Sequence, residues 1–144
     1  MKKVVFSALV LCCFLLSGCG KDGLNRASVS GTVTLDGTPV ADGHVTFNPE
    51  PGTACPTVAG TIKDGSYVIP AKSGPVPGNY TVTVTASAPT GKKVKATVMG
   101  VEKEVDEVKS IIPDKYTGRG GQSPLTAAIV QGKNTVDLKL ESAF

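Results

Sequence analysis

The sequence contains few side chains of the types that perform acid–base or nucleophilic chemistry. Its 144 residues include a single histidine, His44, and four cysteines. One histidine excludes a metal site built on two histidines and leaves His44 as the only candidate imidazole base. Cys55 is the candidate thiol nucleophile, but no His or Asn lies nearby in the sequence to activate it. We therefore expect no catalytic site, and we interpret Cys55 as a small, partly buried thiol.

The acidic residues and the glycine-rich stretches have the spacing of turns. Asp36, Asp42 and Asp64 each precede a glycine, and their spacing matches no calcium-binding loop. The run GRGG over 118–121 lacks the preceding strand, the Lys-Ser or Lys-Thr pair and the helix that accompany a phosphate-binding loop. We expect no cofactor and no metal ion.

The first eighteen residues have the pattern of a secretion signal. Lys2 and Lys3 precede an apolar run over 4–16, which is shorter than the roughly 20 residues that span a bilayer. Residues 1–18 are therefore interpreted as a signal peptide that is removed, and not as a membrane anchor.

A short motif closes this signal. Leu16-Ser17-Gly18-Cys19 resembles the bacterial lipobox, which implies cleavage before Cys19 and acylation of its thiol and of the new amino group. Several acyl chains hold a protein at a membrane far more firmly than one. The next residue is Gly20 and not the Asp associated with inner-membrane retention, so the resemblance implies the outer membrane, at its periplasmic face or its surface. The alternative is an ordinary secretory signal that ends near a cysteine by chance.

The lipobox interpretation also predicts which cysteine remains a free thiol in the mature chain. Cys12 and Cys13 leave with the signal and Cys19 is acylated, so Cys55 remains alone in an exported domain. We expect no intramolecular disulfide.

The remaining chain has the length of one domain and little net charge. Lys and Arg number 15 against 12 Asp and Glu, and two of the lysines belong to the signal. A balance this close to neutral provides no broad basic surface for phosphates, so nucleic acid is not expected as a partner. The polar, glycine-bearing stretch 19–27 is interpreted as a lipidated flexible tether, and 28–144 as a single domain.

Apolar and polar residues alternate with a period of two through most of this domain, which predicts β-strands. The strongest turn signal is Asp64-Gly65, which separates two short alternating runs. The sequence predicts an antiparallel β-sandwich of seven or eight strands, over 29–35, 44–47, 58–63, 66–70, 79–86, 125–130 and 135–140, with 92–98 as the candidate eighth.

The parity of these strands defines the expected core. His44 has the opposite parity to Val45 and is expected to face solvent. The expected core residues are Val33, Leu35, Val45, Phe47, Ile62, Tyr80, Val82, Val84, Leu125, Val136 and Leu138.

One segment, 101–112, departs from the period of two. Its Val101, Val105, Val108 and Ile112 recur at steps of four, three and four, the spacing of one face of a short helix. Branched valines disfavour a helix, so a charged insertion packed over a sheet edge is the alternative. In either form the segment would bind a partner or shield an edge strand.

Several stretches resemble a known family of β-sandwiches. VSGTVTLDGTPVADGHVTF over 29–47 resembles the opening of carboxypeptidase regulatory-like domains, which are transthyretin-like sandwiches. GTIKDGSY over 60–67, PGNYTV over 77–82 and IPDKY over 112–116 resemble segments of small bacterial envelope lipoproteins built on that domain. These are turn and core residues, so the resemblance implies a fold and says little about function.

Two classes of function agree with these features. The first is a non-enzymatic, lipid-anchored module of the cell envelope that supports the envelope or binds a protein or polysaccharide. The alternative is binding of a small ligand or carbohydrate, as transthyretin-like and starch-binding-like folds do. Sugar sites generally need exposed aromatic rings, and the sequence has no Trp and only Tyr67 and Tyr116 to spare once Tyr80 enters the core. We therefore expect the structural or protein-interaction class.

The lipobox gives a direct prediction for Cys19. Replacement Cys19→Ala removes the acyl acceptor, so we expect an unprocessed precursor that incorporates no labelled palmitate. Cys55→Ser is the matched control and should be processed and labelled like the unaltered chain. Mass spectrometry and membrane fractionation test this, and unchanged mass and membrane retention of the Cys19→Ala variant would contradict it.

Overall fold

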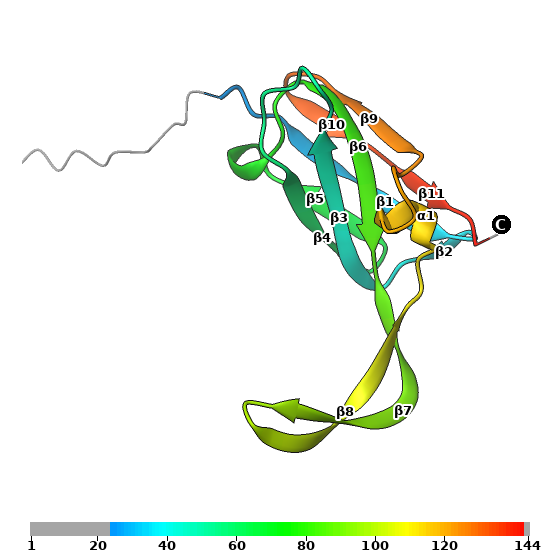
Figure 1. Ribbon diagram of the computed structural model, residues 1–144. Helices are drawn as coiled ribbons and strands as arrows, with labels where there is room; N and C mark the ends of the chain where they lie inside the picture. Colours follow the sequence, from blue (N-terminus) through cyan, green and yellow to red (C-terminus); the bar gives the residue numbers. More distant parts are fainter. Residues whose placement is uncertain (1–23, 143–144) are drawn as a thin grey trace, which may run out of the picture.

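The computed structural model describes residues 24–142, so the expected signal peptide, Cys19 and the start of the tether lie outside the described residues. The described chain is mostly β-structure, with two helical turns, η1 (Ala71–Ser73) and α1 (Asp114–Thr117) (Figure 1). Its strands are β1 (Ser28–Leu35), β2 (Thr38–Pro39), β3 (Asp42–Pro49), β4 (Val58–Lys63), β5 (Ser66–Ile69), β6 (Gly78–Thr85), β7 (Ser87–Val98), β8 (Val101–Ser110), β9 (Leu125–Ile129), β10 (Lys133–Thr135) and β11 (Leu138–Leu140).

Nine of these strands form one curled sheet, which we call the body, and β7 and β8 form a separate hairpin, which we call the arm (Figure 1). The strand order of the body is β10-β1-β5-β4-β3-β6-β9, and β2 and β11 also pair with β1. The all-β, sandwich-like fold predicted from the sequence is confirmed. The pairs are antiparallel except at β1, which β10 and β11 join in parallel.

The core lies inside the curl of the body and is centred on Phe47. The Phe47 ring lies 6.2 Å from the rings of both Tyr67 and Tyr80, centroid to centroid, and all three side chains are buried. Of the eleven expected core residues, eight are buried, and Leu35, Leu125 and Val136 are half-buried against the same cluster. The period of two therefore identified the inward face correctly.

Two Asp-Gly pairs form tight turns, and the sequence predicts the hairpin turn at one of them, Asp64-Gly65. Asp64 and Gly65 connect β4 to β5 with φ of 49° and 76°. Positive φ at both positions gives the turn whose twist matches that of a β-hairpin. Asp36 and Gly37 adopt the same conformation between β1 and β2. The assignment of Asp42 to a turn is wrong, because Asp42 is the first residue of β3 and pairs with a residue of β4.

The segment near the C-terminus that was predicted as one strand over 135–140 is broken at its centre. β10 ends at Thr135 and β11 begins at Leu138. Between them, the Val136 N–H donates to the Ser30 carbonyl at 2.8 Å, and the Tyr67 hydroxyl donates to the Val136 carbonyl at 2.7 Å. The chain comes so close to β1 here that a Cβ on Gly31 would lie 1.9 Å from the Val136 carbonyl oxygen. Only glycine fits at that position of β1.

A carboxylate also stabilises the break between β10 and β11. Asp137 Oδ1 accepts hydrogen bonds from the Thr32 N–H at 2.8 Å and from the Thr32 hydroxyl at 2.9 Å. These bonds favour the charged form, so the pKa of the Asp137 carboxyl lies below its ordinary value. The C-terminal segment is therefore bound to β1 by an ionised side chain as well as by main-chain pairing.

A short cover, formed by α1 and the loop that follows it, lies on the outer face of β6. Tyr116 of α1 is buried, and Gly118 ends the helix in the left-handed conformation close to Thr83. Gln122 donates to the Thr81 hydroxyl at 3.2 Å. This cover explains why Thr81 is buried although its parity places it on the outer face.

The central position of Phe47 predicts a large loss of stability on truncation. Phe47→Ala should lower the free energy of unfolding by about 3 to 5 kcal/mol, because it leaves a cavity between two tyrosine rings. Val68→Ala is the matched control, since the Val68 side chain is 70% exposed and surface substitutions usually change stability by less than about 0.5 kcal/mol. Urea denaturation measures both, and equal effects would contradict the assigned core.

The Asp137 carboxylate predicts a pH-dependent difference in stability. Its folded pKa lies below the unfolded value, so its contribution is present above an unfolded pKa of about 4 and is lost as pH falls through the folded pKa. Asp137→Asn should lower the urea midpoint at neutral pH, and the two midpoints should converge under acid conditions. Glu102→Gln on the arm is the control and should leave the midpoint unchanged throughout. A difference for Asp137→Asn that does not change with pH would contradict the ionised contact.

Candidate functional site

The arm is the most unusual element of the described chain. β7 and β8 pair with each other from Ser87 opposite Ser110 to Val98 opposite Val101, and neither pairs with a strand of the body. In Figure 1 the arm continues from the end of β6 and stands away from the body. It is attached at its root by a hydrogen bond from the Ile111 N–H to the Ala86 carbonyl at 3.1 Å.

The arm corrects both interpretations of 101–112. The helix is wrong because 101–110 is strand β8, and α1, the α-helical turn of the described residues, begins at Asp114. An insertion packed over a sheet edge is also not found, because nearly all residues of β8 are exposed. The candidate strand over 92–98 is a strand, as part of β7, but it belongs to the arm and is not an eighth strand of the sandwich.

The tip of the arm is a two-residue turn made by Met99 and Gly100, with φ of 53° and 80°. Asn or Asp is the usual first residue of such a turn, because a longer side chain is strained at positive φ. The Met99 side chain is 99% exposed. A strained, fully exposed methionine gains nothing from packing within this chain, so its presence at the tip favours a contact outside it.

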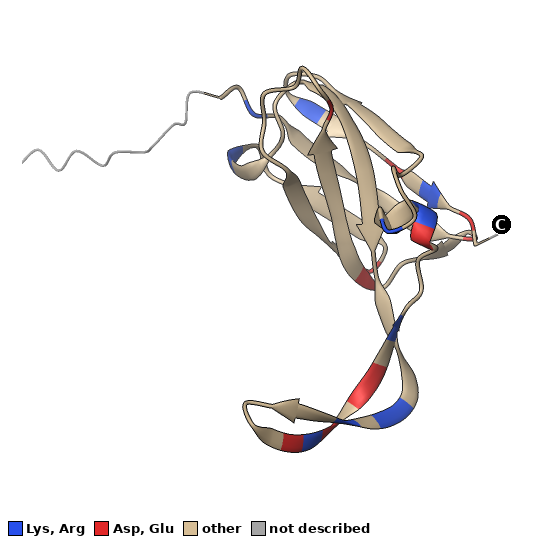
Figure 2. Ribbon diagram, viewed as in Figure 1, with Lys and Arg blue, Asp and Glu red and all other residues tan. Residues whose placement is uncertain are grey.

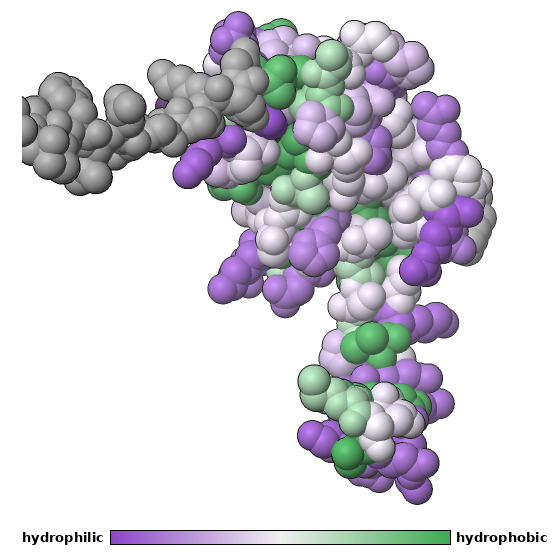
Figure 3. Space-filling view, turned by 60° about the vertical axis from the view of Figure 1, so that its left-hand side comes forward, coloured by the Kyte–Doolittle hydropathy of each residue, from purple (hydrophilic) through white to green (hydrophobic). Residues whose placement is uncertain are grey.

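The two faces of the arm differ in polarity. In the outer part of the arm, over 94–105, one face consists of Val94, Ala96, Val98, Val101 and Val105, together with one long cation, Lys103; we call it the valine face. Val98 is 43% exposed and Val101 is 56% exposed. Figure 3 shows hydrophobic side chains reaching the surface along the arm. A sheet face of this composition is normally covered.

The opposite face of the arm is charged. The register places Lys93 opposite Asp106 and Lys95 opposite Glu104. Opposite charges in such cross-strand positions stabilise a two-stranded ribbon. Because this face is hydrated and the valine face is apolar, the arm is an amphipathic ribbon.

The charges also divide between the two strands (Figure 2). β7 carries three lysines and no acidic residue, whereas β8 carries four acidic residues and two lysines. The strands are therefore basic and acidic, respectively. The charged residues are Lys92, Lys93 and Lys95 on β7, and Glu102, Lys103, Glu104, Asp106, Glu107 and Lys109 on β8.

A bulge interrupts the arm between Pro89 and Lys93. The Thr90 hydroxyl donates to Glu107 Oε2 at 2.6 Å, and Gly91 has a φ of 78°. Bulges increase the local twist and disturb the hydrogen-bonding edge of a strand. The bulge therefore leaves the faces of the outer arm intact while making its β7 edge a poor template for another strand.

The residues considered for chemistry are not assembled into one site. His44 is exposed on β3 beside Thr85, at one end of β6, whereas Cys55 lies beside the Tyr80 hydroxyl near the other end. Cys55 is half-buried, as predicted, and its neighbour Tyr80 could not have been inferred from the sequence because it lies on a different strand. Arg119 lies in the exposed loop after α1.

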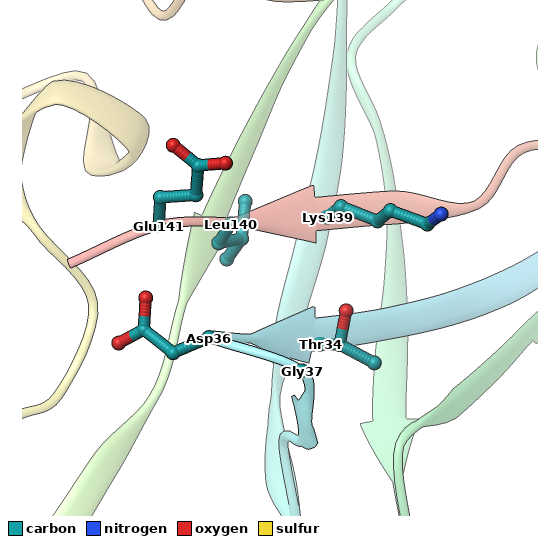
Figure 4. A pocket seen from close by; sticks show the side chains of 6 residues that line it. All are labelled: Thr34, Asp36, Gly37, Lys139, Leu140 and Glu141. Atoms are coloured by element: carbon teal, nitrogen blue, oxygen red, sulfur yellow. The ribbon is translucent and has the colours of Figure 1, made fainter. Parts of the chain in front are cut away.

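A shallow pocket lies where β1 and β11 end (Figure 4). The carboxylates of Asp36 and Glu141 lie at one end of it, and the Lys139 side chain extends toward the other. Asp36 accepts hydrogen bonds from the N–H and the hydroxyl of Ser142, which lower the pKa of its carboxyl. These bonds hold the C-terminal segment at the end of β1. Asp36 therefore has a structural role in the body, and the pocket is not proposed as a binding site.

The two tyrosines that the sequence left as candidates for stacking on a sugar are not exposed. Tyr67 and Tyr116 are buried, like Tyr80, and so is Phe47. Burial raises the pKa of Tyr67 and of Tyr80 above the ordinary value. Over 24–142, no aromatic side chain forms an exposed platform.

Within the part of the chain that the structure describes, no three His, Cys, Asp or Glu side chains are grouped as metal ligands. The helices in this part are too short to span a bilayer. Comparison with known protein families, with curated proteins and with solved structures finds no match for this chain.

The strained tip predicts a stabilising substitution. Met99→Asn should slow hydrogen exchange of the β7 and β8 amides, because asparagine tolerates the positive φ of this turn better than methionine. Gly100→Ala, the opposing control, should accelerate exchange in the arm because its φ is 80°. Exchange in the body should be unchanged in both variants. Equal exchange rates in the arms of all three chains would show that the tip carries no strain.

Proposed function

We propose that this chain is a non-enzymatic, lipid-anchored protein of the cell envelope, in which a carboxypeptidase regulatory-like sandwich holds the arm as a protein-interaction element. The observation that carries the proposal is the exposed valine face on a ribbon that the body does not cover. A two-stranded hairpin is only marginally stable in water. A partner that covers the valine face would supply the missing burial.

The positions of the tether and the arm support this proposal. The described chain enters the body at β1, whose first residues pair with the end of β5. The arm leaves from the opposite end, beyond the pairing of His44 with Thr85. Figure 1 shows the two departing from different ends of the body. A lipid on Cys19 would therefore leave the arm directed away from the membrane.

The burial of the aromatic rings favours a protein partner over a carbohydrate. Stacking on a sugar needs an exposed ring, and every described Tyr and Phe is buried. Branched aliphatic side chains on a flat ribbon instead suit packing against another protein surface. No feature of the pocket between β1 and β11 favours a small ligand over this proposal.

Site-specific photocrosslinking in the native envelope tests the proposed function. A photoreactive residue replacing Val101, on the valine face of the full-length lipidated chain, should give discrete protein adducts. The matched control replaces the neighbouring Glu102, on the charged face, and a second control replaces the exposed Val68 of the body. Adducts to polysaccharide, or no protein adduct specific to position 101, would refute the proposal.

A further inference from the structure

The valine face has a layered arrangement that determines what can cover it. Its cross-strand pairs form three levels, Val98 with Val101 at the tip, Ala96 with Lys103 in the middle and Val94 with Val105 nearest the bulge. The outer levels present two branched side chains each. The middle level presents one small and one long side chain. A covering surface must be flat at both ends and must accommodate a lysine stem between them.

The same face of a second arm meets these requirements. Two sheets pack face to face at about 10 Å. If a two-fold axis runs along the arms, each level meets the same level of the other copy, with β7 of each copy over β8 of the other. Ala96 of one arm then lies opposite Lys103 of the second copy and leaves space for its methylene stem, while the ammonium group reaches the edge of the stack.

The charges favour this orientation over the opposite one. An axis along the arms places Lys103 of each copy over Ala96 of the other, so the two cations of the stacked faces lie on opposite sides of the stack. An axis across the arms through the middle level would instead place β8 over β8 and bring the two Lys103 side chains together. The separation of like charges determines orientation more than affinity.

Pairing by the edges of the arms is less favourable. Two β7 edges would bring lysines together, two β8 edges would bring carboxylates together, and the bulge interrupts the β7 ladder. A β7 edge against a β8 edge would be complementary in charge but would repeat without closing. Stacking of the valine faces gives a closed pair.

From these observations we infer that two copies of this chain pair by stacking the valine faces of their arms, which point in the same direction with β7 of each over β8 of the other. This inference rests on the proposed function of the arm and names its partner as a second copy. Arms that point the same way leave both tethers on the same side, as two copies in one membrane require. The interface is small, so confinement in a common membrane would supply the effective concentration that keeps the pair together.

Crosslinking between two differently tagged full-length copies in one envelope tests the inference. Both copies carry Cys55→Ser, one carries Val98→Cys and the other Val101→Cys. A thiol crosslinker that spans about 10 Å, the separation of stacked sheets, should join the two tags. The matched pair carries Thr97→Cys and Glu102→Cys, which form the adjacent cross-strand pair but lie on the charged face, and should give at most a tenth of that yield.

A disrupting variant tests the contact itself. Val94→Lys in both copies adds two cations to the two Lys103 side chains of the stack and should lower the crosslink between positions 98 and 101 at least tenfold. Thr97→Lys adds the same charge on the outer face and should leave the crosslink unchanged. Hydrogen exchange of β7 and β8 in each variant shows that the arm still forms.

The outcomes separate this inference from the proposed function. Equal crosslinking of the inner-face and outer-face pairs would overturn the stacked arrangement. If the photoreactive residue at position 101 captures a different envelope protein and the two tags are not joined, the second copy is excluded while the proposed function stands. If position 101 captures no protein at all, both the pairing of two copies and the proposed function are refuted.

Discussion

The body depends on the close contact between the Val136 carbonyl and β1. Gly31 provides the space for this contact, the Tyr67 hydroxyl satisfies the carbonyl, and Asp137 fixes the next residue to Thr32. Through this contact, β10 and β11 occupy in parallel the edge of β1 that β5 leaves open. The first and last strands are thus joined, and Asn134 bonds to both Ser28 and Val130 across the gap between β1 and β9. A body closed in this way does not need the arm to complete it.

Stability is therefore distributed unevenly along the chain. The rings around Phe47 and the strands on either side of them bury nearly all of their inward side chains. The arm has no such interior, and its two strands depend on each other's hydrogen bonds and on opposite charges in cross-strand positions, such as Lys95 and Glu104. Elements with few buried contacts open at low cost in free energy, and binding elements are commonly of this kind. The separation allows the arm to change its packing without disturbing the core.

The sequence predicted those parts of the fold that depend on local pattern. Alternation placed Phe47 and Val82 inward, and Asp64-Gly65 gave a hairpin turn, because both signals act between near neighbours in the chain. The break at Val136 could not be predicted, since it results from contacts with β1 more than a hundred residues earlier. The arm was missed because Met99 is not a usual turn residue. Lipidation at Cys19 and envelope function remain predictions, because Cys19 lies outside the described residues and no contact within the body or the arm bears on either.

The spacing of the valines explains why the arm was mistaken for a helix. A step of four residues keeps side chains on one face of both a helix and a strand, so Val101 and Val105 share a face in either structure. A step of three does so only in a helix, and in β8 it places Val108 on the charged side, where it is 63% exposed. The partner strand decides between the two, because Val94, Ala96 and Val98 add apolar side chains beside Val101 and Val105 only in a hairpin. The valine face therefore forms only when β7 and β8 pair, and it lies on the side of the arm opposite the charged cross-strand pairs.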